Sequence, residues 1–247
     1  MNRLYLLVLP LLAVTAADLA AQRTLDFSGY EWTVRRSNGE EGPGPNVFLD
    51  NRRTAWLDDA GRLHLRIWNR DGAWYTAEVR LREPLGYGTY HFQTAGDLRF
   101  PSPEVILGLF LYDHDAPDEF YREIDIEYGR FGNPDAPEGQ FAVQPFDRPG
   151  NRHGFMLPPD EALTREPVMT HAFRWQPGNL EFRVALGEYD DLFVLPDDHR
   201  LMVSGWTLRG PSVTEPGTET VHVNLWLYEG SATAAGVATS SSARPAA

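Results

Sequence analysis

Apolar and polar residues alternate along most of this chain, whereas apolar residues at helical spacing are almost absent. Residues 63–67, 75–81 and 180–186 show the alternation most clearly. Successive side chains of a strand point to opposite faces, so each of these segments has one apolar face and one polar face. The pattern predicts strands, and a short turn at 159–164 is the only helical piece that we expect.

Strands with one apolar face bury that face by stacking as two sheets, and the outer concave face can then hold an extended ligand. The 247 residues suit one large all-β domain. We therefore predict an all-β sandwich of two antiparallel sheets in a single domain. Segments 39–45 and 133–139 are rich in Gly, Pro and Asn and are expected to be surface loops.

The first 21 residues have the pattern of a targeting segment. Arg3 supplies a positive start, residues 4–16 are nearly all apolar, and small residues at 19–21 suit cleavage. The apolar run is short and is broken by Pro10, which makes it a poor membrane span. We predict a signal peptide at 1–21, and hence a secreted or periplasmic protein.

The remainder divides into a folded domain at 22–230 and a tail at 231–247. The tail is rich in Ser and Ala, and we expect it to be frayed.

Composition excludes several classes of protein. Cysteine is absent, which excludes disulfides, thiolate metal sites and cysteine nucleophiles. The net charge of −13 argues against nucleic acid and favours a neutral polymer over an anionic one. The sequence has no zinc-protease, serine-esterase or phosphate-loop motif. We expect a monomer that binds a polysaccharide and has neither a membrane partner nor a cofactor.

The strongest candidate site lies on the segment 121–128. Strand alternation places Glu123, Asp125 and Glu127 on one face and the apolar residues between them on the other. Like charges this close cannot all stay ionised, so at least one carboxyl should keep its proton to a higher pH. One ionised and one protonated carboxyl are what glycoside cleavage with retention requires. The alternative interpretation is a solvated acidic strand.

The two catalytic carboxyls of a retaining glycosidase stand roughly 5 Å apart. Cα atoms four residues apart on a strand are separated by about 13 Å, so Glu123 and Glu127 would have to lean toward each other across Asp125. Glutamate is long enough to do so.

The segment 221–228 is a second candidate. Its apolar residues alternate with His222, Asn224, Trp226 and Tyr228. Aromatic rings beside hydrogen-bonding groups suit a sugar, whose ring faces are apolar and whose edges are polar. The alternative is that Trp226 is merely buried under a loop.

A third candidate is the pair Glu78 and Arg80, which share the polar face of segment 75–81. An exposed ion pair is the ordinary explanation. In a cleft, the same pair can orient a carboxylate or a sugar hydroxyl.

A calcium site is a weaker candidate, because the spacing of the acidic residues matches no calcium loop. We favour a solvated acidic loop for Asp113, His114, Asp115, Asp118 and Glu119.

The motif Glu123-Ile-Asp-Ile-Glu127 resembles the E-x-D-x-E signature of family 16 glycoside hydrolases, which include lichenases and laminarinases. Further landmarks occur in the order typical of that family across residues 27–228. These are Ala77-Glu-Val-Arg80, Gly86-Tyr-Gly-Thr-Tyr90, Leu107-Gly-Leu-Phe-Leu-Tyr112, His171-Ala-Phe-Arg-Trp-Gln-Pro-Gly178 and Asn224-Leu-Trp226.

The resemblance implies a concanavalin A-like jelly roll that hydrolyses internal β-glucan-type bonds with retention in a concave cleft. Glu123 would be the nucleophile, Glu127 the acid/base, and Asp125 the neighbour that tunes their protonation. The residues implied in substrate binding are Glu78, Arg80, Phe110, Tyr112, Asn224 and Trp226. Some relatives hold a structural calcium ion, for which this sequence indicates no ligands.

The chain departs from the family pattern at two places. Many members carry a tryptophan shortly before the first catalytic glutamate, where this chain has Phe120-Tyr-Arg122. Members also close the sandwich with an apolar strand after the Asn-Leu-Trp segment. Residues 231–247 lack such a pattern, so we expect an outer sheet without its edge strand.

Overall fold

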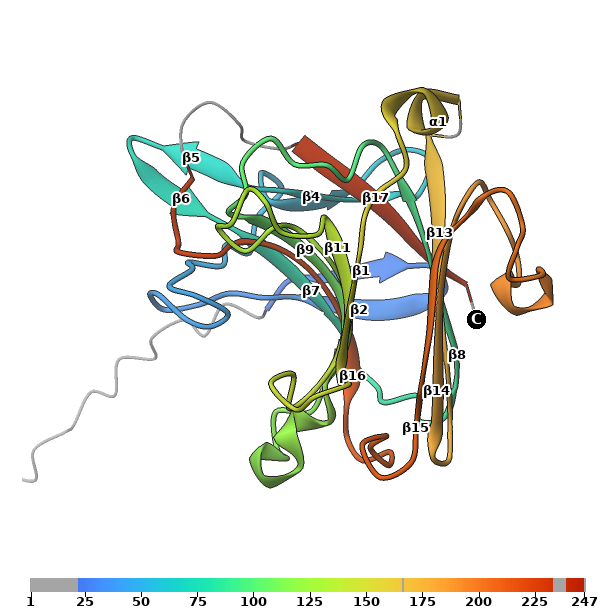
Figure 1. The fold of residues 1–247 in the computed structure, drawn as a ribbon. Coiled ribbons are helices and arrows are strands. Elements are labelled where there is room, and N and C mark those ends of the chain that lie inside the picture. Colours follow the sequence, from blue (N-terminus) through green and yellow to red (C-terminus); the bar gives the residue numbers. More distant parts are fainter. Residues whose placement is uncertain (1–21, 166, 233–238, 247) are drawn as a thin grey trace, which may run out of the picture.

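The computed structural model describes residues 22–165, 167–232 and 239–246, which form two stacked antiparallel sheets (Figure 1). The first sheet has the order β1 (Thr24–Phe27), β2 (Tyr30–Val34), β7 (Ala77–Leu81), β16 (Thr220–Leu227), β9 (Val105–Tyr112), β10 (Ile124–Tyr128), β11 (Gly139–Val143), β12 (Arg152–Phe155). The second has the order β15 (Met202–Arg209), β14 (Asn179–Leu186), β13 (Val168–Gln176), β8 (Gly88–Ala95), β17 (Thr239–Ala246), β4 (Leu63–Arg66), β3 (Ala55–Leu57). The prediction of an all-β sandwich is confirmed.

The remaining elements are short. β5 (Trp68–Arg70) and β6 (Ala73–Tyr75) form a separate hairpin. The helix α1 (Asp160–Arg165) lies where the turn was predicted, and two 3-10 helices, η1 (Pro117–Arg122) and η2 (Leu192–Val194), occupy loops.

The core lies between the sheets and is made by the apolar face of each strand. Ile124 and Ile126 of β10 are fully buried in it, as is Val223 of β16. Rings from the two sheets meet there, with Phe141 of β11 stacked 4.9 Å from Phe182 of β14. Burying such side chains stabilises the fold by about 1.5–3 kcal/mol each. Because one face is fixed in the core, the alternate residues must face outward.

The C-terminal residues differ from the expectation of a frayed tail and a missing strand. Residues 239–246 form β17, which pairs with β8 on one side and β4 on the other. The prediction relied on apolar alternation, whereas strand pairing depends on backbone hydrogen bonds that a Ser- and Ala-rich segment also supplies. Residues 233–238 and 247 of the predicted tail lie outside the described residues.

The predicted signal peptide at 1–21 also lies outside the described residues. In the described ranges, no helix combines the length and apolar character needed to cross a membrane.

Candidate active site

The strand β10 presents three acidic side chains to the outer face of the first sheet. Asp125 and Glu127 alternate with the buried isoleucines, and Glu123 immediately precedes the strand. All three line both of the large hollows on this face. We call Glu123, Asp125 and Glu127 the carboxylate row. The expected separation of acidic and apolar faces is therefore observed, and the solvated-strand interpretation is wrong because Asp125 is only 5 % exposed.

Burial and mutual repulsion keep protons on the carboxylate row. Burial raises the pKa of Glu123, and the charge of Glu127 raises it further. Burial together with both neighbours raises the pKa of Asp125 well above its ordinary value. The pKa of Glu127 is raised by burial despite a 2.8 Å hydrogen bond from Gln140 Nε2, which lowers it. The row therefore holds at least one proton near neutral pH.

The registers of the strands set a second line of residues across the sheet at the level of Glu127. Glu127 pairs with Gly108 of β9, Gly108 with Asn224 of β16, and Asn224 with Glu78 of β7. A Cβ atom on Gly108 would come within 2.6 Å of Asn224 Oδ1, so glycine is required for this packing. Asn224 is 2 % exposed, and its buried Oδ1 has no hydrogen-bond partner among the described residues. A ligand hydroxyl can supply the missing donor.

Two hollows meet at the carboxylate row. The first hollow, of about 430 Å³, is lined by Glu78, Phe110, Tyr112, Asn224 and other residues of β7, β16 and β9. The second hollow, of about 650 Å³, is lined on the other side of β10 by residues of β11 and β12 that include Gln140 and Arg152. Pro43 and Trp226 line both hollows. An extended ligand that lies across the strands would therefore cross the carboxylate row.

Trp226 is 7 % exposed, and its ring lies 6.3 Å from that of Phe131. Because Trp226 nevertheless lines both hollows, it is covered on one side and available to a ligand on the other.

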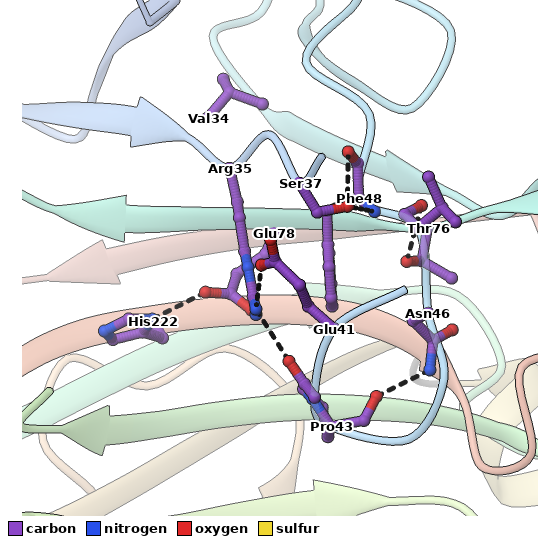
Figure 2. A network of polar contacts seen from close by, with 12 residues as sticks. Val34, Arg35, Ser37, Glu41, Pro43, Asn46, Phe48, Thr76, Glu78 and His222 are labelled. Carbon is purple, nitrogen blue, oxygen red and sulfur yellow. Dashed lines mark hydrogen bonds and ion pairs between the residues drawn. The ribbon is translucent and has the colours of Figure 1, made fainter. Parts of the chain in front are cut away.

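Glu78 is the fourth carboxylate that lines the first hollow, and it is paired with Arg35 rather than with Arg80. Arg35 Nη1 donates to Glu78 Oε2 at 2.8 Å, and His222 Nδ1 lies 3.0 Å from Glu78 Oε1 (Figure 2). The exposed Glu78–Arg80 pair considered from the sequence is wrong, because Glu78 is 3 % exposed. Arg80 lines an adjoining hollow that shares Tyr112 and His114 with the first hollow.

The electrostatics of Glu78 are opposite to those of the carboxylate row. Burial alone would raise the pKa of Glu78, but the hydrogen bond from His222 and the charge of Arg35 lower it to about 2. Burial lowers the pKa of His222, so its ring is neutral and donates through Nδ1 to the ionised Glu78. Thr220 Oγ1, 3.1 Å from Nε2, is the other partner of the ring.

The first residues of the segment 121–128 do not belong to the strand, which begins at Ile124. Phe120, Tyr121 and Arg122 have φ values of 50°, 57° and 49°, which is left-handed backbone that costs about 1–3 kcal/mol per non-glycine residue. The ion pair of Arg122 with Asp113, at 3.0 Å, holds this turn. The turn stacks Tyr121 on Tyr112, with centroids 4.8 Å apart. An aromatic pair thus stands immediately before the carboxylate row.

The acidic loop after β9 has a structural role. The Asp113 carboxylate accepts hydrogen bonds from the Thr218 backbone N–H and hydroxyl in addition to Arg122. Among the described residues, no group of three His, Asp or Glu side chains is arranged to hold a metal ion.

Sequence reasoning missed several residues of the cleft, among them Arg35 and Pro43. Arg35 follows β2 outside any motif, and its only signal was a charge next to a strand end. Pro43 belongs to the segment predicted as a surface loop, yet it lines both hollows. Neither position could be found from strand alternation, because both lie in a loop that folds back over the sheet.

Comparisons with known proteins find similarity of structure only. No protein-family model matches the sequence, and no curated protein matches it either. Solved structures match with TM-scores just below 0.6. The β-glucanase of Bacillus licheniformis superposes with a TM-score of 0.58 at 18 % identity, over 86 % of this chain and 88 % of that one.

Two mycobacterial structures are similar to the same extent. A family 16 glycosyl hydrolase protein of Mycobacterium smegmatis has a TM-score of 0.58 at 15 % identity, over 86 % of this chain and 88 % of that one. An immunostimulatory antigen and pseudo β-1,3-glucanase of Mycobacterium tuberculosis has a TM-score of 0.56 at 17 % identity, over 87 % and 91 %. This chain therefore has the concanavalin A-like jelly-roll fold of the family 16 β-glucanases.

Proposed function

We propose that this protein is a retaining, endo-acting glycoside hydrolase that cleaves a β-linked polysaccharide of the β-1,3/1,4-glucan type. The carboxylate row carries the proposal, because it combines carboxyls whose pKa values are raised with open space on both sides. Sugars can occupy the hollows on either side of the bond that is cut, which suits cleavage within a chain. The fold shared with β-glucanases supports the same substrate class.

The proposed reaction has two steps. The step starts from the protonation state of the row in which Glu123 is ionised and Glu127 holds the proton. Glu127 gives this proton to the glycosidic oxygen while Glu123 attacks the anomeric carbon, so that the glycosidic bond breaks and a glycosyl ester forms. The deprotonated Glu127 then takes a proton from a water molecule, whose oxygen attacks the anomeric carbon and releases Glu123. Asp125, between the two, modulates their protonation through its own raised pKa. A sugar hydroxyl that replaces the water gives transglycosylation.

Substrate contacts are proposed for residues that line the first hollow or the adjoining hollow that Arg80 lines. Asn224, with its unpartnered buried oxygen, and Glu78, held ionised, are the hydrogen-bonding candidates. The complete set is Glu78, Arg80, Phe110, Tyr112, Asn224 and Trp226.

The test is release of reducing ends from a panel of β-glucans by the wild type and by Glu123→Gln. We expect release from at least one β-glucan by the wild type and its loss in the variant, because a neutral amide cannot attack. Undiminished release by Glu123→Gln would reject the assignment.

The second candidate is a polysaccharide-binding module without turnover. It is favoured by one observation, namely that a structure with this fold is called a pseudo β-1,3-glucanase. Binding of β-glucan without any release of reducing ends by the wild type would favour the module.

Export is proposed from the segment 1–21. Expression of the full chain with its native start should give a mature protein that begins near residue 22, as measured by intact mass. An uncleaved exported chain would contradict the proposal.

A further inference from the structure

The loop from Glu41 to Asn46 forms a side wall of the cleft, and we call it the 41–46 wall. Pro43 of this wall lines the first and the second hollow, as the carboxylate row and Trp226 do. Pro43 therefore stands where the two hollows meet. Any chain that reaches from one hollow into the other has to pass this residue.

Arg35 holds one side of the wall. Its Nη2 donates to Glu41 Oε2 at 3.1 Å and to the Gly42 carbonyl at 2.8 Å, while its Nη1 binds Glu78 on the floor of the cleft (Figure 2). The guanidinium also lies 3.9 Å above the ring of Phe48. A planar guanidinium with five fixed donors can join wall and floor in this way, whereas a lysine ammonium cannot reproduce the geometry.

Asn46 holds the other side. Its Nδ2 donates to the carbonyls of Pro43 and Leu227, both at 2.7 Å, and its Oδ1 accepts from the Leu227 N–H at 3.1 Å. The wall also packs tightly on the end of β16, since a Cβ atom on Gly44 would come within 2.8 Å of the Tyr228 carbonyl. Hydrogen bonds to the Gly42 carbonyl and to the Pro43 carbonyl thus fix the backbone on both sides of the Pro43 ring.

We propose that the 41–46 wall, positioned by Arg35, makes the cleft selective for polysaccharide chains without a branch on the sugars beside the carboxylate row. This rests on the proposed function and adds a substrate restriction to it. A wall that is hydrogen-bonded at both sides does not move aside without losing those bonds, so a bulky substituent at this point meets fixed atoms. Rejection by steric exclusion needs no additional attractive contact to the unbranched chain.

The first experiment removes the side chain of Pro43 from the 41–46 wall. We compare kcat/KM for a linear β-glucan and for a branched β-glucan with the same backbone, in the wild type and in Pro43→Gly. The wild type should prefer the linear chain by about tenfold or more, the scale on which a pocket discriminates by fit. Pro43→Gly should reduce that ratio to about threefold or less, mainly through faster cleavage of the branched chain.

The second experiment loosens the wall and has a matched control. Arg35→Gln should lower the linear-to-branched ratio, and Arg35→Lys should restore it only in part. Because Arg35 also binds Glu78, its replacement can change the cleavage of both substrates. The ratio of the two kcat/KM values cancels any change that is common to both. Arg23→Gln is the control, because Arg23 likewise binds a carboxylate, that of Asp50, and two backbone carbonyls, with a side chain 25 % exposed against 21 % for Arg35. It should leave the ratio unchanged.

The outcomes separate this proposal from the proposed function. Equal cleavage of both chains by the wild type, or an unchanged ratio in Pro43→Gly, rejects the proposed selectivity of the 41–46 wall. Neither result affects the proposed hydrolase activity. If the wild type cleaves no chain of the β-glucan panel, linear or branched, the proposed hydrolase activity is rejected. Calorimetric affinities of the wild type and Pro43→Gly for linear and branched oligosaccharides then test the selectivity of the 41–46 wall. Equal affinity of the wild type for both, or binding of neither, then overturns it.

Discussion

Four carboxyl groups line the first hollow, yet they fall into two groups of opposite protonation. Glu78 has Arg35 at 2.8 Å and a histidine at 3.0 Å, and its pKa lies at about 2. The carboxylate row has amide donors and the charge of Arg152, and the pKa values of its three members are raised. Burial raises the pKa in both groups, so the partners decide the protonation. The difference separates a permanently ionised binding group from a group able to exchange protons.

The largest effect expected from this comparison is on turnover. Glu127→Gln removes the proposed proton donor and should lower kcat on a β-glucan by about 10²–10⁴-fold, the usual contribution of a general acid. Glu78→Gln should act mainly on KM, since it removes a sugar contact. Steady-state kinetics of the two variants on one substrate check this, and an equal loss of kcat in both would erase the distinction.

The next effect concerns stability. Arg35→Met leaves the buried Glu78 carboxylate without its cation and should lower the free energy of unfolding by about 3–5 kcal/mol. The double variant Arg35→Met/Glu78→Gln should recover part of that loss, because no unpaired charge remains. Denaturant unfolding of the single and double variants measures this coupling. Additive effects would mean that the two side chains do not depend on each other.

A smaller effect is expected at Gly108, which lies between the two groups. Gly108→Ala places a methyl group against Asn224 Oδ1 and should lower the free energy of unfolding by about 1–3 kcal/mol, with an increase in KM. Gly205→Ala is a suitable control, since the nearest atom to its added Cβ is 3.6 Å away. Unchanged stability and KM in Gly108→Ala would show that the cleft floor can shift.

The smallest effect is a contrast in pH dependence. The folded-state pKa of Asp125 is raised, so between its unfolded value near 3.9 and that raised value the folded protein binds the extra proton and stability falls as pH rises. The Tm of Asp125→Asn should therefore exceed that of the wild type between pH 5 and pH 8. The difference should be about 2–4 °C for each kcal/mol gained in the free energy of unfolding.

The pH dependence of stability that Glu78 contributes has the opposite sign. Its folded-state pKa is lowered to about 2, so its contribution is present above its unfolded value and is lost as pH falls from about 4.3 toward 2. Glu78→Gln should thus be less stable than the wild type at pH 7, and the difference should shrink below pH 4. Parallel Tm curves for both variants across pH 3–8 would refute the division into two groups.

Strand alternation predicted much of this molecule because burial of one face fixes the direction of every side chain on a strand. It placed Glu127 and Asn224 on the outer face, which the registers through Gly108 bring to one level. It offered Arg80 as the partner of Glu78, whereas Arg35 reaches Glu78 from a different strand end. It also missed β17, whose pairing depends on backbone groups rather than on an apolar alternation of side chains.

The turn before Glu123 could not be predicted for a different reason. Three consecutive non-glycine residues with positive φ are unfavourable locally and persist only through tertiary contacts such as the ion pair between Arg122 and Asp113. Local propensity therefore pointed to a strand where the structure has a strained turn.

The most direct test of the central claim is covalent trapping with an activated 2-fluoro β-glucoside oligosaccharide, followed by peptide mass spectrometry. A slowed second step should leave one glycosyl group attached, and we expect that group on Glu123 in the peptide that spans β10. A label on Glu127 or on Glu78, or a first product of inverted anomeric configuration, would contradict it.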